Sequence, residues 1–371
     1  MKPAEFMPAS RIEQWVARIV RDDIQSLRPY SVPESAGMVK LDAMENPHAL
    51  PPALRAQLGE LASAVALNRY PDPLARELKV ALREYMQVPD AMELVLGNGS
   101  DEIIQLLALG CARPGGSMLG VEPSFAMFPL IARVCGLQFA GVPLRADFSL
   151  DTDAVIAAMA RHRPALVFLA YPNNPTGNLF DAAAIERIVR AAPGLVVIDE
   201  AYHPFAQASF MPRLQEFPNL VLMRTLSKLG LAGLRLGMLI ASPEWSVQFE
   251  KLRLPYNVNA LSQVVATRVL RSAHVLEAQA AEIRNERSRL AAKLQAMPGV
   301  TVYPSQANFL LFRVPGASAV CDALKASGIL IKNLAGAHPA LENCLRVTVG
   351  TAAENDAFLA ALAASLGPAH A

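Results

Sequence analysis

A single lysine stands in an apolar, glycine-rich stretch, MRTLSKLGLAGLRLGMLIAS, which covers residues 223–242. Its only charged side chains are Arg224, Lys228 and Arg235. Apolar surroundings lower the pKa of a lysine, so part of Lys228 would be a free amine able to form a Schiff base. Donors suited to a phosphate dianion stand nearby, on Thr225, Ser227 and Arg235. The segment therefore indicates an amine nucleophile beside an anion site.

A second motif, LGNGSDE at residues 96–102, joins a strand-like run to a helix-like one. Its glycines permit a tight turn, and the N–H groups of Gly99, Ser100 and Asp101 would form a phosphate cup at the helix start. The same residues also suit an ordinary turn with an N-cap at Ser100 or Asp101. A dinucleotide fingerprint would need a third glycine where this chain has Glu102. That reading also leaves Lys228 unexplained.

Two more strand ends carry polar side chains. YPNNPTG, residues 171–177, forms a rigid turn that would project Asn173 and Asn174, although asparagine-rich turns are common. LVVIDEAY places Asp199 at the tip of an apolar run. A buried acid costs free energy unless it is paired with a cation or with hydrogen-bond donors. A cationic heterocycle, an arginine or a helix cap would each satisfy Asp199.

The elements that position these motifs alternate between strand-like and helix-like segments from about residue 93 onward. This order predicts an α/β fold with a largely parallel sheet, whose ligands bind beyond the carboxyl ends of the strands. The composition then shifts, and a smaller α+β domain is expected. We predict an N-terminal helix and arm (1–48) that pack with the small domain, a large domain (49–261) and a small C-terminal domain (262–371).

Composition limits the class of protein. The chain has 371 residues, 53% hydrophobic and 18% charged, with a net charge of +1, which gives no electrostatic case for nucleic acid or an anionic membrane. No apolar run approaches the roughly 20 residues of a membrane span, and the N-terminus lacks the pattern of a signal peptide. The four cysteines are widely separated and show no metal spacing. These features predict a soluble cytoplasmic protein without a metal.

Taken together and in order, the motifs resemble one known family. They are NRYPDP, GNGSDE, EPSFAMF, YPNNPTG, VIDEAY, TLSKLGLAGLRLG, ANFLLF and LRVTVGT. From about residue 38 to residue 366 the chain is similar to fold-type-I aminotransferases that depend on pyridoxal 5′-phosphate (PLP), and most to the histidinol-phosphate aminotransferases. The resemblance implies a large domain with a mostly parallel seven-stranded sheet between helices, a smaller α+β domain and PLP as cofactor.

The resemblance also implies roles for single residues. Lys228 would bind PLP covalently and then carry the proton between the substrate Cα and cofactor C4′. Asp199 would pair with the pyridinium nitrogen, which lets the ring accept electrons. Asn174 and Tyr202 would bind the phenolic oxygen of the cofactor. Phe125 would stack on the ring, at a position where the family often has tyrosine.

Further implied residues surround the two anionic groups of the site. The cofactor phosphate would be bound by Gly99, Ser100, Asp101, Thr225, Ser227 and Arg235. Tyr70 resembles the residue that reaches the phosphate in the neighbouring subunit, so a homodimer is expected. Arg346 matches the arginine that binds the anionic end of the substrate, and Lys332 stands where relatives often have a second arginine. In the arm, Asn46 is a predicted substrate contact, whereas Met44 replaces the family's polar residue.

The resemblance therefore implies transamination between L-histidinol phosphate and 2-oxoglutarate, which gives imidazole-acetol phosphate and L-glutamate, in histidine biosynthesis. An aromatic amino-acid aminotransferase and a PLP-dependent threonine-phosphate decarboxylase share the same architecture and remain alternatives. A PLP-binding transcriptional regulator would need a DNA-binding domain ahead of the arm. Only about 37 residues precede the arm, and they contain no basic recognition helix.

Overall fold

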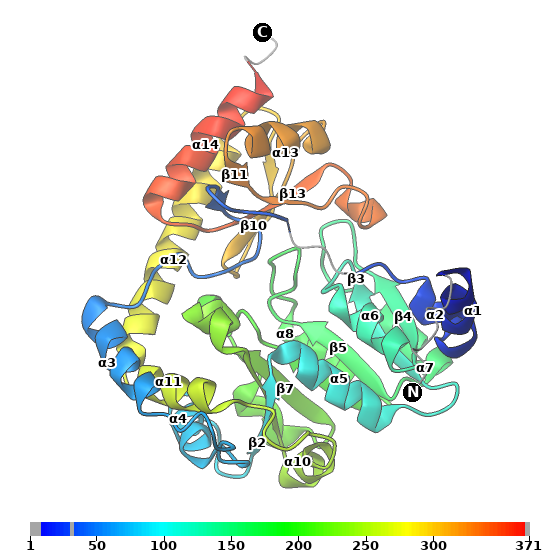
Figure 1. Ribbon diagram of the computed structural model, residues 1–371. Coiled ribbons are helices and arrows are strands. Elements are labelled where there is room, and N and C mark those ends of the chain that lie inside the picture. Colours follow the sequence, from blue (N-terminus) through cyan, green and yellow to red (C-terminus); the bar gives the residue numbers. More distant parts are fainter. Residues whose placement is uncertain (1–8, 30–32, 368–371) are drawn as a thin grey trace.

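The computed structural model describes residues 9–29 and 33–367. Its centre is a seven-stranded sheet (Figure 1) in which only β8 runs antiparallel to its neighbours. In spatial order the strands are β2 (Glu93–Asn98), β8 (Leu236–Ala241), β7 (Leu220–Thr225), β6 (Leu195–Asp199), β5 (Leu166–Ala170), β3 (Ser117–Glu122) and β4 (Gln138–Pro143). The prediction of a mostly parallel seven-stranded sheet is confirmed.

Helices cover both faces of this sheet, which explains why its central strands are largely apolar, except for Asp199 at the end of β6 and Arg224 and Thr225 at the end of β7. In β6, Val196 and Ile198 pack into one core while Val197 packs into the other, because successive side chains point to opposite faces. The first face is covered by α4 (Arg76–Met86), α7 (Thr152–His162), α8 (Ala182–Ala191) and α11 (Ala260–Leu270). The second is covered by α5 (Ser100–Cys111), α6 (Met127–Val134) and α10 (Pro243–Glu250).

The C-terminal part forms a smaller α+β unit around a core of its own. Its antiparallel sheet has the order β12 (Lys332–Asn333), β13 (Cys344–Thr348), β10 (Phe309–Arg313) and β9 (Thr301–Val302). The helices are α12 (Ala273–Gln295), α13 (Ala317–Ala326) and α14 (Ala352–Leu366). The long helix α12 connects this unit to the large one in Figure 1. α3 (Pro52–Ser63) packs against α11.

The N-terminal segment divides between the two units. β1 (Val39–Lys40) pairs in parallel with β11 (Ile329–Leu330) of the small unit. The helices α1 (Ala9–Ile19) and α2 (Asp22–Gln25) lie instead beside the large unit, where the Nη2 of Arg21 donates to the carbonyls of Arg133 and Val134. The prediction that the N-terminal helix packs with the small domain is therefore wrong, because the exposed carbonyls at the end of α6 bind Arg21.

The boundary between the domains stays a proposal. Ala266, Val269 and Leu270 of α11, and Leu276 at the start of α12, are buried in the core of the large unit. Farther along α12, Ala280, Ile283 and Leu290 belong to the core of the small unit. This packing supports a boundary within α12, later than residue 262.

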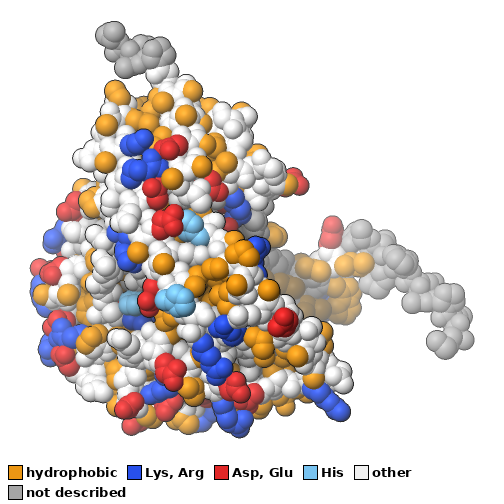
Figure 2. Space-filling view, turned by 90° about the vertical axis from the view of Figure 1, so that its left-hand side faces the viewer, with side chains coloured by type: hydrophobic (Ala, Val, Ile, Leu, Met, Phe, Trp, Pro, Cys, Tyr) orange, Lys and Arg blue, Asp and Glu red, His pale blue; other side chains and the backbone are white. Residues whose placement is uncertain are grey.

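Of the helices in the described ranges, none combines the length and the apolar character needed to cross a bilayer. On the face shown in Figure 2, which is the side of α3 and α12 in Figure 1, acidic and basic side chains are interspersed. That face therefore presents no large area of a single charge.

Candidate active site

The predicted site residues come from segments that end at one edge of the central sheet. Asn174 follows β5, Asp199 is the last residue of β6, and Lys228 lies in a π-helical turn (Ser227–Leu231) just after β7. Carboxyl ends of parallel strands meet at the same edge, so distant parts of the sequence are brought together there. β13 of the small unit supplies Arg346 from the opposite side.

Lys228 is partly buried, and its Nζ donates a hydrogen bond to the carbonyl of Ala43, 3.1 Å away. Burial, together with the positive charge of Arg346, lowers the pKa of Lys228 to about 8. Low-dielectric surroundings disfavour the ammonium form of the side chain. A substantial fraction of Lys228 is thus a neutral amine near pH 8, as a nucleophilic lysine requires.

Asp199 is 4% exposed, and its Oδ1 accepts a hydrogen bond from the backbone N–H of Ala201 at 3.0 Å. Burial is the main cause that raises the pKa of Asp199 to about 7, and Asp101 and Glu200 add to the effect. Among the described residues, no arginine or lysine forms an ion pair with this carboxylate. A cationic ring nitrogen at this position would compensate the buried charge.

A chain of polar contacts joins three more predicted residues. The Nδ2 of Asn174 donates to the Tyr202 hydroxyl at 3.0 Å, and the Nη1 of Arg346 donates to Asn174 Oδ1. All three side chains are buried, and burial raises the pKa of Tyr202. The Arg346 guanidinium also lies over the ring of Phe309, 5.3 Å from its centre. Asn174 therefore links the tyrosine of the large unit to the arginine of the small unit.

The start of α5 forms a narrow cup against β8. Gly99 has a φ of +90°, and a Cβ built there would lie 2.7 Å from the Nη2 of Arg235, so the guanidinium lies directly against this glycine. A Cβ on Gly237 would lie 2.4 Å from the backbone N of Ser100. The glycines thus allow an arginine and a helix N-terminus to converge, as in a phosphate site.

Three other cup residues lie close by. The Thr225 hydroxyl donates to the carbonyl of Leu236 at 2.9 Å and accepts the N–H of Ser227 at 3.1 Å. Asp101 is influenced electrostatically by Arg235 and by Lys228, and burial raises the pKa of Asp101. Its Oδ1 is buried and has no hydrogen-bond partner in the described chain. The set Gly99, Ser100, Asp101, Thr225, Ser227 and Arg235 is therefore assembled beside Lys228.

Three other predicted residues, Phe125, Asn46 and Lys332, lie outside the phosphate cup and the Asn174 contacts. Phe125 is half-buried and packs edge-on against Phe128, with ring centres 5.5 Å apart. Asn46 donates from Nδ2 to the carbonyl of Leu229 and to Gln279 Oε1, each at 3.0 Å. Asn46 thus holds the turn that carries Lys228. Lys332 pairs with Arg346 across β12 and β13, so both side chains leave the small sheet on the same face.

Tyr70 does not join the other residues within this chain. Its side chain is 80% exposed and stacks on Tyr256, with ring centres 4.4 Å apart. An exposed stacked aromatic pair is typical of a surface that a partner covers.

The arm contributes contacts that the sequence motifs did not indicate. The carbonyl of Asp42 accepts from Arg346 Nη2 at 3.1 Å, and the carbonyl of Ala43 accepts from Lys228. The Tyr202 hydroxyl lies 3.6 Å from the sulfur of Met44, whose φ is +54°. Backbone carbonyls carry no information on residue type, so the sequence marked this segment through Met44 and Asn46 but did not indicate the carbonyl contacts.

A buried ion pair behind the site was also missed. The Nη2 of Arg224 lies 2.8 Å from Glu200 Oε2, and both side chains are almost fully buried. Ser209 and the backbone N–H of Phe210 donate to the same carboxylate. Because Glu200 follows Asp199 and Arg224 precedes Thr225, this pair ties the ends of β6 and β7 together. The signal available in the sequence was the one arginine within the apolar β7.

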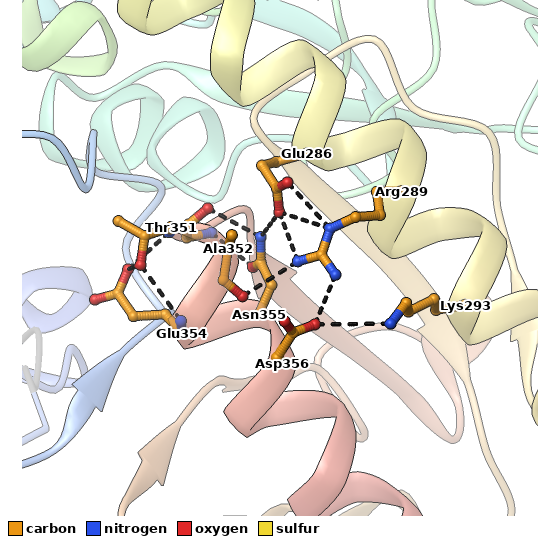
Figure 3. Close-up of polar contacts among 9 residues, drawn as sticks. Glu286, Arg289, Lys293, Thr351, Ala352, Glu354, Asn355 and Asp356 are labelled. Atoms are coloured by element: carbon orange, nitrogen blue, oxygen red, sulfur yellow. Dashed lines mark hydrogen bonds and ion pairs between the residues drawn. The ribbon is translucent and has the colours of Figure 1, made fainter.

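Figure 3 shows a polar network that fixes the segment after Arg346. Asn355 is fully buried, accepts the N–H of Gly350 on its Oδ1 and donates to Glu286. Arg289 joins Glu286 of α12 to Asp356 of α14. The network holds α12 and α14 together and thereby fixes the loop that follows β13.

A cavity of about 580 Å³ lies on another side of the Thr225–Leu229 segment. Its lining includes Glu200, Arg224 and Arg284, but neither Lys228 nor Asp199. The converging polar groups around Lys228, and not this cavity, identify the candidate active site.

Comparison with known proteins supports this interpretation. Residues 36–362 match the family model described as aminotransferase class I and II. Histidinol-phosphate aminotransferase 2 of Cupriavidus pinatubonensis is 58% identical over 356 residues, which cover 95% of this chain and 97% of the relative. Histidinol-phosphate aminotransferase 1 of Ralstonia nicotianae is 54% identical, with 96% of each chain covered.

Solved structures give the same result. The crystal structure of histidinol-phosphate aminotransferase from Sinorhizobium meliloti in complex with PLP is 26% identical. It superimposes with a TM-score of 0.83 and covers 94% of this chain and 97% of its own. The similarity thus extends over both structural units.

Proposed function

Because this chain belongs to the aminotransferase class I and II family, we propose that it transfers an amino group between L-histidinol phosphate and 2-oxoglutarate, with PLP as cofactor. The products are imidazole-acetol phosphate and L-glutamate, in a reaction of histidine biosynthesis. Two relatives that are more than 50% identical over nearly the whole chain carry the name histidinol-phosphate aminotransferase. The structural neighbour with bound PLP supports the cofactor.

The residues present fit this cofactor. The cup formed by Gly99, Ser100 and Arg235 suits a phosphate, and Asp199 lacks the cation that its burial requires. When bound, PLP supplies an aldehyde for a primary amine and a ring that stabilises negative charge at the substrate Cα. Lys228 provides the amine, and its lowered pKa favours the neutral form.

The side chains then have separate tasks. Lys228 acts as a general base that accepts the proton from the substrate Cα, and then as a general acid that donates it to cofactor C4′. A pKa near the working pH suits both roles. Asp199 keeps the ring nitrogen protonated by charge pairing. Tyr202 and Asn174 bind the phenolic oxygen and, through the contact of Asn174 with Arg346, connect it to the substrate site.

Arg346 and Lys332 bind the anionic groups of the two substrates. A guanidinium forms paired hydrogen bonds with a carboxylate or a phosphate, whereas an ammonium acts as a compact charge. Arg346 therefore serves both the α-carboxylate of glutamate and the phosphate of histidinol phosphate. Lys332, on the same face of the small sheet, adds positive charge for the phosphate. Asn46 acts on the substrate indirectly, by holding the Lys228 turn.

The active form is a homodimer in which Tyr70 reaches the cofactor phosphate of the neighbouring subunit. Exposed apolar side chains occur in the segment around Tyr70 and in the segment that leads into α11: Leu67, Tyr70, Leu74, Leu254, Tyr256 and Leu261. Tyr70 and Tyr256 stack on each other, and exposed large apolar side chains that lie together are typical of a protein interface. All four cysteines are free, which supports a cytoplasmic location.

The observation that carries the proposal is the partly buried Lys228, whose pKa is lowered to about 8, beside a buried Asp199 that forms no ion pair with an arginine or lysine of the described residues. To test it, the purified holoenzyme is reduced with borohydride, and its peptides are analysed by mass spectrometry. We expect the pyridoxyl group on Lys228, and glutamate formation from 2-oxoglutarate that depends on L-histidinol phosphate. Modification of another lysine, with full activity in Lys228→Ala, would refute the proposal.

A further inference from the structure

A line of polar contacts runs outward from the phosphate cup. Glu102, in the first turn of α5, accepts the backbone N–H of Asn98 on its Oε2. The same oxygen accepts the Nδ2 of Asn257 at 2.8 Å, and Asn257 also donates to the carbonyl of Leu96 at 3.0 Å. Asn257 is therefore fixed to both ends of the turn that leads from β2 into the cup.

The other side of Asn257 connects to a different loop. Its Oδ1 accepts from the Nη1 of Arg253 at 2.9 Å, and the Nη2 of Arg253 donates to the carbonyl of Pro73 at 3.0 Å. Tyr256, the residue before Asn257, stacks on Tyr70. Two independent contacts thus bind the loop around Asn257 to the loop that carries Tyr70.

These contacts leave Asn257 little freedom. The amide has three hydrogen-bond partners, in Glu102, Leu96 and Arg253, so any rotation of the side chain would break several of them. Tyr256 has a φ of +63°, a conformation that nonglycine residues adopt only when their surroundings hold them there. The contacts of Asn257 and Arg253 therefore form a continuous connection between the turn at the cup and the Tyr70 loop.

We propose that Glu102 and Asn257 are positioning residues that couple the phosphate cup to the subunit interface, so that binding of PLP strengthens the dimer. The inference rests on the proposed function, since it requires PLP in the cup and Tyr70 at the interface. The coupling acts in both directions: a factor by which PLP tightens the dimer equals the factor by which dimerisation tightens PLP binding.

The test measures the dimer dissociation constant by analytical ultracentrifugation, with and without saturating PLP. For the wild-type protein we expect PLP to lower this constant by on the order of tenfold or more, the usual size of coupling between sites. In Asn257→Ala the ratio of the two constants falls toward one. Glu102→Ala behaves in the same way, while Glu102→Gln, which keeps an acceptor oxygen, retains part of the coupling.

Asn259→Ala is the matched control. Asn259 lies two residues farther along, and its side chain caps α11 through the N–H of Ser262, with no contact to the cup. This variant loses a helix cap but keeps the wild-type effect of PLP on dimerisation. If Asn257→Ala does not fold, Arg253→Lys interrupts the same line of contacts at its outer end.

The outcomes separate this inference from the proposed function. If the wild-type protein binds PLP at Lys228 and transaminates, but its dimer constant does not respond to PLP, the coupling is refuted and the function stands. The coupling is also refuted if Asn257→Ala, Glu102→Ala and Arg253→Lys all keep the wild-type ratio. A protein that takes up no PLP on Lys228 fails the earlier test instead.

Discussion

Burial displaces the pKa values of Lys228 and Asp199 toward neutrality from opposite sides. The pKa of the lysine falls to about 8, and that of the aspartate rises to about 7, because each charged form is poorly solvated. In the proposed complex, a positively charged ring nitrogen would stabilise the ionised Asp199. A proton can then move to or from Lys228 at a small cost in free energy near neutral pH.

The lowered pKa of Lys228 predicts the pH dependence of cofactor binding. Only the neutral amine attacks an aldehyde, and a pKa of about 8 places the transition below the ordinary lysine value of 10.5. The rate at which cofactor-free protein takes up PLP covalently should therefore rise with pH, with its midpoint near 8, and then level off. Stopped-flow absorbance measures this rate. A midpoint near 10.5 would show that the site does not perturb Lys228.

Lys332 and Arg346 predict different effects on the two substrates. Lys332→Ala should lower kcat/KM for L-histidinol phosphate by about tenfold or more, the value of a hydrogen bond to a charged group. The same variant should leave kcat/KM for L-glutamate nearly unchanged, whereas Arg346→Gln should reduce both. Single-turnover half-reactions give the two constants separately.

Lys325→Ala serves as the control for this prediction, because Lys325 is an exposed lysine at the end of α13. Equal losses for both substrates in Lys332→Ala would contradict the assignment of Lys332 to the phosphate.

At the scale of elements, the cup depends on the close approach of β8 to the start of α5. A Cβ at Gly237 would lie 2.4 Å from backbone atoms of Gly99 and Ser100, so Gly237→Ala must push the two segments apart. Such overpacking costs about 1–3 kcal/mol, and we expect PLP affinity to fall by about tenfold. Equilibrium titration of the cofactor-free protein measures the affinity.

Gly233→Ala is the matched control, since a Cβ at Gly233 has no neighbour within 4 Å. Wild-type affinity in Gly237→Ala would mean that the cup does not hold the phosphate. A similar loss in both variants would point to a general effect of alanine in this segment.

The order of strands and helices was predictable from the sequence, because apolar runs alternate regularly with amphipathic segments. The sequence also indicated Lys228, Asp199 and Asn174 as strand-end residues, and the structure brings them to one edge of the sheet. It could not indicate that the carbonyls of Asp42 and Ala43 contact Arg346 and Lys228. The packing of α2 against α6 was missed for a similar reason, since Arg21 binds backbone carbonyls there.

At the scale of the whole molecule, the exposed Tyr70 predicts that two subunits share each active site. Tyr70→Phe and Lys228→Ala subunits should complement each other when mixed and allowed to exchange. In a mixed dimer, one site combines the intact Lys228 of the first subunit with the intact Tyr70 of the second. Activity of the mixture should therefore exceed the sum of the two separate variants. A mixture that shows only the sum would place Tyr70 outside the neighbouring site.

The measurement that tests the central claim most directly is a single half-reaction. The purified holoenzyme is mixed separately with L-histidinol phosphate and with L-phenylalanine, and conversion of its cofactor to pyridoxamine phosphate is followed by absorbance. We predict rapid conversion with histidinol phosphate and slow conversion with phenylalanine, because in the proposed site the positive charges of Arg346 and Lys332 would bind the phosphate, which phenylalanine lacks. Faster conversion with phenylalanine would contradict the proposed substrate, and no conversion with either amine would contradict transamination itself.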